Sequence, residues 1–375
     1  MSIVVGRAGD LWYGRAVSLA SASAGCDVWA FGPEALGRVL RGVDGTRVFA
    51  ALQRPWRWQA GRPLLAARLF ADLAEHGLVL PSVERTQVSA DGSRKLLLAM
   101  PGGGSAEIVH MPRAAGPERV TLCVSSQIGC ALGCAFCATA TLGLERHLSA
   151  GEIVGQVLGA LHAHGPRHPG ELTLVFMGMG EPLHNFTNVA QAIGVLTHPS
   201  GLGLSPRRIT VSTAGLVPQI AALAELERRP LLAVSLNATT DALRSELMPI
   251  NRRYPLEALH AALVRYPCRP RERITVEYVL LGAVNDGPED AARLADFCAG
   301  FPHQINVIPW NAHPGSRFRA PTEAELDAFV AALLRRRPAL VTVRRSRGRD
   351  IDAACGQLAR LSLRREPAAT GLSAT

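Results

Sequence analysis

Three cysteines in one short run of the sequence could hold a metal centre. Cys130, Cys134 and Cys137 are spaced C-x3-C-x2-C. A 4Fe–4S cluster has four iron atoms, and each of them can bind one cysteine thiolate. Three cysteines therefore leave one iron without a protein ligand. An open iron can bind a small molecule, and S-adenosylmethionine (SAM) offers an amino group and a carboxylate for it. The spacing therefore favours a 4Fe–4S cluster that binds SAM.

A structural zinc site is the alternative for the same cysteines, because closely spaced cysteines often bind zinc in intracellular proteins. Zinc would need a fourth ligand, which Cys123 or His147 could supply. Phe136 precedes the last cysteine and completes a pattern that resembles the signature of the radical-SAM superfamily. We therefore expect the cluster and keep zinc as the alternative.

The length of the chain and its net charge limit the class of protein that it can be. A chain of 375 residues can form one large domain and a smaller one. The net charge is +9, and Lys95 is the only lysine among the 40 basic residues. A basic chain favours a polyanionic partner such as a nucleic acid. The densest basic cluster, expected to contact RNA phosphates, is Arg344, Arg345, Arg347 and Arg349.

The cysteine content and the hydropathy indicate a cytoplasmic protein. Eight cysteines in this length are too few for a disulfide scaffold. No apolar run approaches the ~18 residues of a membrane span. The stretch before Cys26 contains Asp10 and Arg15, which argues against a signal peptide.

The pattern of apolar residues predicts an α/β fold. Residues 1–84 read as a mainly helical accessory domain, including Glu34–Leu40 and Pro63–His76, and residues 85–117 as a small antiparallel β meander. Residues 118–358 alternate strands and helices, which predicts a partial (β/α)6 barrel. Residues 359–375 are expected to be a disordered tail. Predicted strands are 120–124, 172–176, 209–211, 231–235, 274–281 and 304–308; predicted helices are 150–164, 186–197, 215–229, 255–266 and 287–300.

Polar and glycine-rich motifs follow the ends of most predicted barrel strands. In parallel β/α barrels these strand ends meet on one face, where the chemistry takes place. Glu181 could hold the ammonium group of SAM, while neutral side chains such as Asn237 suit a carboxylate, a ribose or an adenine edge. The expected SAM-binding residues are Gly180, Glu181, Ser212, Ser235, Leu236, Asn237 and Asn311.

From about Arg85 to Leu358 the chain resembles the RlmN/Cfr family of radical-SAM methyltransferases, which act on an adenine of 23S ribosomal RNA. The most diagnostic string is Arg-Gly-Arg-Asp-Ile-Asp-Ala-Ala-Cys-Gly-Gln-Leu at 347–358. The chain departs from the family pattern at Asn237, where histidine is usual, and at Ala140, where glycine is usual. Other matching strings lie at 121–127, 175–183, 209–215 and 248–252.

The resemblance implies roles for three further residues. Cys355 would accept a methyl group from one SAM. A second SAM, cleaved at the cluster, would generate the radical that activates this methyl group for addition to adenine. Glu107 would remove the proton from the attacked carbon, and Cys123 would release the product by forming a disulfide with Cys355. Two SAM molecules would thus be used per turnover.

The resemblance also implies partners. The substrate would be 23S rRNA, with tRNA as a second candidate, and carbon 2 of the adenine is favoured over carbon 8. An electron donor such as flavodoxin would be required, and the protein is expected to be a monomer. Two alternatives stay open: a radical-SAM enzyme acting on another RNA or a small molecule, and a non-catalytic metal-cluster protein that binds RNA.

Overall fold

The computed structural model describes residues 27–40, 43–53, 79–113, 119–164, 171–313, 315–336, 338 and 340–358. The predicted helix Pro63–His76 and the predicted tail at 359–375 lie outside these ranges. Within them, no helix is long and apolar enough to cross a membrane.

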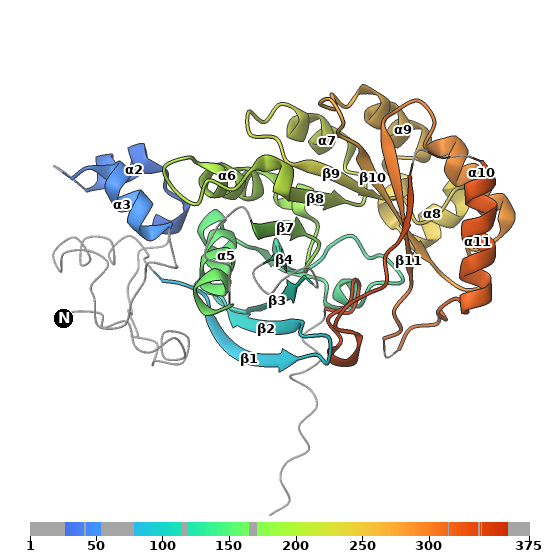
Figure 1. The fold of residues 1–375 in the computed structure, drawn as a ribbon, viewed down its shortest axis with the longest axis horizontal. Helices are drawn as coiled ribbons and strands as arrows, with labels where there is room; N and C mark the ends of the chain where they lie inside the picture. The colour runs from blue at the N-terminus through green and yellow to red at the C-terminus, as the bar shows by residue number, and fades with distance from the viewer. Residues whose placement is uncertain are drawn as a thin grey trace, which may run out of the picture.

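The described residues form one ten-stranded sheet that curves around the molecule (Figure 1). At one edge is the antiparallel meander of β1 (Ser82–Val88), β2 (Arg94–Ala99) and β3 (Ser105–Pro112), and β3 pairs antiparallel with β4. From β4 onward neighbouring strands are parallel. In order they are β4 (Val120–Cys123), β7 (Leu172–Phe176), β8 (Ile209–Thr213), β9 (Leu231–Ser235), β10 (Ile274–Leu280), β11 (His303–Pro309) and β12 (Val341–Val343).

Helices cover the outer face of the parallel strands (Figure 1). The first of them starts at a capping box, in which the Glu152 N–H donates to the Ser149 hydroxyl (3.0 Å) and the Ser149 N–H donates to the Glu152 carboxylate (2.9 Å). These helices are α5 (Ala150–His164), α6 (Phe186–Thr197), α7 (Val217–Ala224), α9 (Leu256–Arg265), α10 (Pro288–Phe297) and α11 (Glu323–Arg335), while the short α8 (Asp241–Leu247) lies at the ends of β8 and β9.

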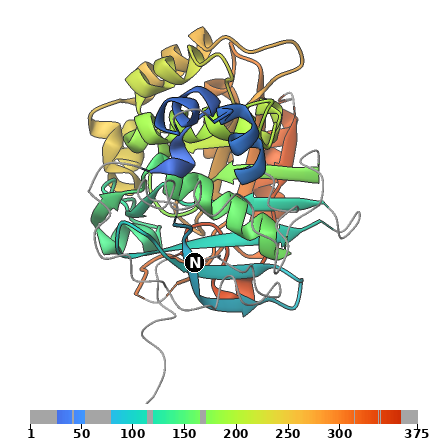
Figure 2. The ribbon, with the colours of Figure 1, turned by 90° about the vertical axis from the view of Figure 1, so that its left-hand side faces the viewer.

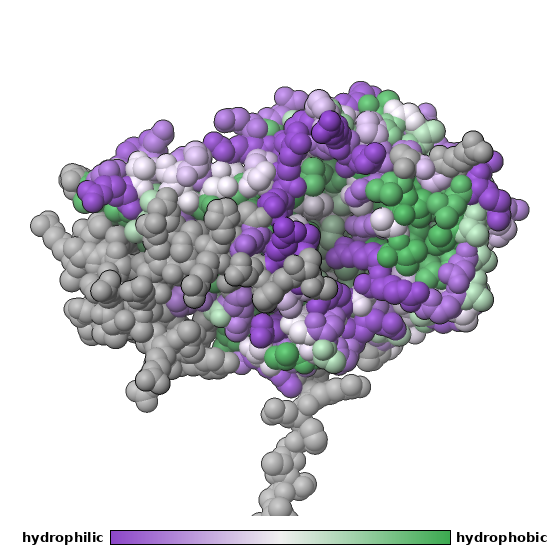
Figure 3. Space-filling view, in the orientation of Figure 1, coloured by the Kyte–Doolittle hydropathy of each residue, from purple (hydrophilic) through white to green (hydrophobic). Residues whose placement is uncertain are grey.

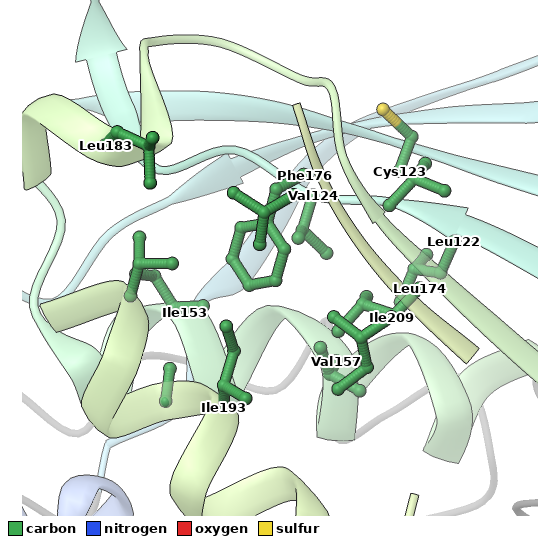
Figure 4. Packing of buried hydrophobic residues seen from close by; sticks show 14 of the residues in the cluster. Leu122, Cys123, Val124, Ile153, Val157, Leu174, Phe176, Leu183, Ile193 and Ile209 are labelled. Atoms are coloured by element: carbon green, nitrogen blue, oxygen red, sulfur yellow. The ribbon is translucent and has the colours of Figure 1, made fainter. Parts of the chain in front are cut away.

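The two faces of the parallel strands differ in chemistry. Outward side chains such as Leu174 and Ile209 are fully buried and pack against helix residues such as Val157 and Ile193 (Figure 4). Cys123 points to the other side of β4 (Figure 4), as alternation along a strand requires. Polar residues recur on that inner face: Thr173, Thr210, Ser212, Ser235, Thr275, Glu277, Gln304 and Asn306. The barrel interior is therefore a polar lumen and the apolar core lies outside it.

The N-terminal part packs on the outside of the barrel helices. A 3-10 turn η1 (Val28–Ala30) lies against α5 and α6, next to α2 (Pro33–Val39) and α3 (Gly45–Leu52) (Figure 2). The Gln191 side-chain amide donates to the Ala30 carbonyl at 3.1 Å. The face shown in Figure 3 is largely hydrophilic, with a hydrophobic area over the region of β11 and α11.

The structure confirms the predicted alternation of strands and helices, with local corrections. Strand β1 begins at Ser82, so the predicted helical character up to residue 84 and the predicted start of the meander at residue 85 were wrong. Helix α7 ends at Ala224, short of the predicted residue 229. A hairpin of β5 (Gln127–Gly129) and β6 (Leu144–His147), together with α8, α11 and β12, was not predicted.

Candidate active site

The three-cysteine loop follows β5 directly, and two glycines shape it. Gly129 has φ 74° and Gly133 φ 66°, both in the left-handed region. A Cβ at Gly129 would lie 1.8 Å from the Gly143 carbonyl oxygen, which accepts the Cys130 N–H at 2.8 Å. Glycine is thus required for the chain to close this loop.

Hydrogen bonds hold the cysteine loop against three other segments. The Ala135 N–H donates to the Leu247 carbonyl at the end of α8 (2.9 Å), and the Ala138 N–H to the Gly356 carbonyl (2.7 Å). The Trp310 indole N–H, just beyond β11, donates to the Phe136 carbonyl (2.9 Å). The loop is therefore fixed by both the barrel and the C-terminal segment.

The three thiols fit a cationic cluster. Burial raises the pKa of each, to about 12 for Cys130, and the proximity of the other thiols raises it further for Cys130 and Cys134. A bound iron–sulfur cluster would instead stabilise the thiolates. In the described part of the chain no three His, Cys, Asp or Glu side chains are grouped around a single ion.

Glu181 lies beside this loop at the carboxyl end of β7. Its carboxylate accepts the N–H groups of Leu183 (3.0 Å) and Ala214 (2.8 Å), the latter just after β8. Burial nonetheless raises the pKa of Glu181 to about 7. Gly180 before it has φ 95° and packs on Gln127. A buried carboxylate oriented in this way could bind an ammonium group.

The other residues expected to contact SAM lie on the same rim, that is, at the carboxyl ends of the barrel strands. Two of their side chains already form hydrogen bonds within the protein. The Asn237 side chain is buried; its oxygen accepts the Val279 N–H (2.9 Å) and its NH2 lies 3.3 Å from the Met248 sulfur. The Asn311 amide donates to the Ser346 hydroxyl (2.8 Å). Ser212 and Ser235 end their strands half-buried on the lumen face, and Leu236 is buried. In this structure Asn237 shapes a turn.

Arg244, which sequence analysis missed, organises this rim. Its guanidinium is fully buried and donates to the carbonyls of Leu236 (3.0 Å), Ser235 (3.1 Å) and Ala214 (2.7 Å). A fourth bond reaches the Asn251 side chain at 2.9 Å. One arginine on α8 thus ties together the ends of β8 and β9, where SAM binding is expected.

Cys123 and Cys355 line one cavity of about 260 Å³. Burial raises the pKa of Cys123 to about 12; the nearby Cys355 raises it further, while Arg344 lowers it. The cavity also includes Met177 and residues from β3. Two thiols that are remote in sequence therefore line one cavity at the inner face of β4, next to the cysteine loop that is bonded to Gly356.

The loop that carries Cys355 is docked on the hairpin turn between β1 and β2. The Asp350 carboxylate accepts the Ser89 hydroxyl (2.6 Å) and the Ala90 N–H (3.0 Å). Asp91 accepts the Gly348 N–H (3.0 Å) and pairs with Arg347 (3.3 Å). The meander is therefore the platform on which the Cys355 loop rests.

The basic cluster is largely engaged within the protein. Arg344 lies in the cavity and pairs with the lumen residue Glu277 (3.9 Å), and Cys355 together with Glu277 raises its pKa. Arg345 pairs with Glu323 on the surface (2.7 Å). Phosphate contacts by the four arginines stay a prediction, and the position of Arg344 beside the thiols was indicated by no sequence signal.

Glu107 lies on β3 and is fully buried. It shares a strand face with Val109, which lines the cavity. Its carboxylate lies 3.5 Å from the Nζ of Lys95 on β2. The Ser125 hydroxyl, just beyond Cys123, donates to the Glu107 carbonyl at 2.6 Å. The expected base is thus near the thiol pair, although it does not line the cavity itself.

The fold and the three-cysteine loop are those of a radical-SAM enzyme, and comparison with known proteins agrees. Residues 124–295 match the family model described as the radical SAM superfamily. A crystal structure of a radical SAM methyltransferase from Sphaerobacter thermophilus is similar, with a TM-score of 0.81 and 39% identity, covering 89% of this chain and 99% of that one.

Curated relatives show which family within the radical-SAM superfamily the chain belongs to. A dual-specificity RNA methyltransferase RlmN from Syntrophotalea carbinolica is 50% identical over 73% of this chain and 72% of its own length. One from Geobacter sulfurreducens is 44% identical over 88% of this chain and 91% of its own length. The chain belongs to the RlmN/Cfr family of radical-SAM RNA methyltransferases, which implies a 4Fe–4S cluster and SAM as cofactors.

Proposed function

We propose that this protein methylates carbon 2 of an adenine in 23S rRNA, with tRNA as a second substrate, through a methylated Cys355. The observation that carries the proposal is that Cys123 and Cys355 line one cavity. A radical-SAM enzyme that only cleaves SAM has no use for such a pair. A methyl carrier that must be released from its product needs both thiols.

The cofactors follow from the donors at the rim. Cys130, Cys134 and Cys137 would hold the 4Fe–4S cluster, and Glu181 the ammonium of SAM. Gly180, Ser212, Ser235, Leu236, Asn237 and Asn311 would shape the rest of the SAM site. When bound, the cluster and SAM supply the one-electron chemistry that an unreactive aromatic carbon requires. Two SAM molecules are used per turnover, one of them as methyl donor to Cys355.

The protein's own side chains then complete the transfer. Cys355 presents its methyl carbon to the adenine, and Glu107 accepts the proton that leaves the attacked ring carbon. The Cys123 thiolate attacks the Cys355 sulfur and a Cys123–Cys355 disulfide forms. The bond between the Cys355 sulfur and the transferred carbon breaks, and that carbon keeps the electron pair and takes up a proton to become the methyl group. An electron donor such as flavodoxin supplies electrons to the cluster, and a reductant must reopen the disulfide.

The protein is proposed to act on RNA as a monomer. We assign residues 1–84 as an accessory domain, 85–117 as the meander, 118–358 as the barrel with the Cys355 loop, and 359–375 as a tail. The net charge of +9 favours a polyanion at the surface.

Mass mapping of methylated adenine tests this proposal. Ribosomal RNA and tRNA from a deletion strain, incubated with the anaerobically reconstituted protein, SAM and dithionite, should gain 2-methyladenosine at defined sites. Methylation at carbon 8 would correct the position. SAM cleavage without any RNA methylation would overturn the function, and a colourless protein that cleaves no SAM would overturn the enzyme class.

A further inference from the structure

Lys95 forms a buried ion pair with the expected base. Its Nζ lies 3.5 Å from the Glu107 carboxylate, and the two side chains are 5% and 0% exposed. In the β2–β3 register Lys95 faces Val109, and Glu107 lies two residues earlier on β3. This diagonal spacing is within reach of a long side chain on one sheet face. Because Val109 lines the thiol cavity, the pair belongs to the cavity side of the meander.

The same ammonium also contacts the loop that carries Cys355. Lys95 Nζ donates to the Asp352 carbonyl at 3.2 Å, three positions before Cys355. Asp352 itself has φ 52°, in the left-handed region, so its carbonyl is directed by an unusual backbone conformation. One cation therefore bridges the strand of the expected base and the loop of the methyl carrier.

The residue type at this position is informative. The chain has 40 basic residues, and every one except Lys95 is arginine. A second buried pair, Arg229–Glu272 at 3.4 Å, is made with arginine. Lysine offers a compact ammonium with three rotatable donors, whereas arginine is a rigid planar fork. A compact ammonium can contact both a buried carboxylate and a carbonyl that approach from different elements, as Lys95 does here.

We infer that Lys95 is a positioning residue for the methyl transfer: its ammonium fixes the Glu107 carboxylate relative to the Cys355 loop. The inference rests on the proposed role of Glu107. Its contribution is geometric, since Lys95 touches neither RNA nor cofactor in this scheme. Removing the ammonium leaves Glu107 buried without this cation and releases the Asp352 carbonyl, so the base and the methyl carrier lose their fixed relation.

A double-mutant cycle tests the coupling, using the full-length reconstituted protein and rRNA from a deletion strain. Glu107→Gln should lower the single-turnover rate of RNA methylation about 100-fold or more, as for loss of a general base. Lys95→Gln should lower it at least about tenfold, and the double variant should match Glu107→Gln within about threefold. The inference would be overturned if the rate losses of the two single variants multiply in the double variant. It would also be overturned if Lys95→Gln is as active as the wild type.

Two further measurements separate positioning from folding. Cys355 methylation, read by intact mass, should be normal in Lys95→Gln, because the transfer of a methyl group from SAM to Cys355 does not use the Glu107 carboxylate in the proposed scheme. Arg229→Gln removes a matched buried cation remote from the site, and its effect should multiply with that of Glu107→Gln. If Lys95→Gln fails to fold, Lys95→Arg takes its place, because it keeps the charge. Lys95→Arg should show intermediate activity and the same coupling to Glu107→Gln. If the losses of Lys95→Arg and Glu107→Gln multiply in the double variant, the inference is contradicted.

The outcomes also separate this inference from the proposed function. An active Glu107→Gln variant would remove Glu107 as the base, and the inference would fall with that assignment while the thiol chemistry stood. An inactive Glu107→Gln beside a fully active Lys95→Gln would overturn the positioning role alone.

Discussion

Cys123 and Cys355 face the same cavity, with the guanidinium of Arg344 beside both thiols. Cys123 is held by β4 at the centre of the sheet, and Cys355 by a loop docked on the meander. The Cys123 thiol is therefore held rigidly by a strand, whereas the Cys355 thiol lies on a segment that forms neither helix nor strand. This asymmetry suits a fixed resolving thiol and a methyl carrier that must meet both SAM and RNA.

The thiol pair gives the sharpest prediction. Cys355→Ala should carry no methyl group and form no adduct, whereas Cys123→Ala should retain RNA on the protein, because no thiol attacks the thioether link. Denaturing gels of protein purified from cells should show a ribonuclease-sensitive band for Cys123→Ala only. Cys268→Ala, a half-buried cysteine outside the site, is the control. Normal product formation by free Cys123→Ala protein would refute the mechanism.

The cluster loop gives a second prediction. Single alanine variants of Cys130, Cys134 and Cys137 should each lose the visible absorbance of the cluster and all cleavage of SAM, because three ligands leave no spare thiolate. The spectra of anaerobically reconstituted variants measure this, again with Cys268→Ala as control. A full cluster spectrum in any of the three would contradict the assignment.

Arg344 should control the release step through the pKa of Cys123. Burial keeps Cys123 protonated near neutral pH, with its pKa about 12, so the thiolate fraction and the rate of adduct release should rise about tenfold per pH unit. Arg344→Met removes the charge that lowers this pKa and should prolong the adduct about tenfold or more. Quenched single turnovers between about pH 6 and pH 9 would show it. Arg336→Met, which breaks only the exposed pair with Asp296 (2.8 Å) and does not line the cavity, should behave like wild type.

Arg244 should matter for stability as well as for SAM binding. Arg244→Met removes four hydrogen bonds, three of them buried and one partly buried. Each partner left unsatisfied costs about 1–3 kcal/mol, so we expect a loss of at least about 3 kcal/mol. Thermal melting and calorimetry of SAM binding would measure both effects. A stable variant that binds SAM normally would show that the rim forms without this arginine.

The sequence predicted the barrel well because its outward strand faces are apolar and β-branched and its turns are marked by glycine and proline. Helix α11 was missed although Thr322 and Glu325 form a capping box, a signal that was available. Strand β12 is three residues long with little buried surface, too short for any pattern.

Most of the predicted site follows the ends of barrel strands, and it could be predicted because topology alone brings those ends together. The contacts of Lys95 and Arg344 could not be predicted. Lys95 reaches Asp352 across 257 positions, and Arg344 reaches Glu277 from a loop that no periodicity describes. Such contacts depend on tertiary docking, which leaves no local signal in the sequence.

The docking of the Cys355 loop on the β1–β2 turn has a consequence for biosynthesis. Ser89 and Asp350 lie 261 positions apart, so the hairpin leaves the ribosome long before its partner is made. During that interval Cys123 can already sit in its strand, but the second thiol does not yet exist. The reactive pair is therefore assembled only near the end of translation, after the cysteine loop and every barrel strand are present. A prematurely terminated chain could fold much of the barrel and still be chemically silent.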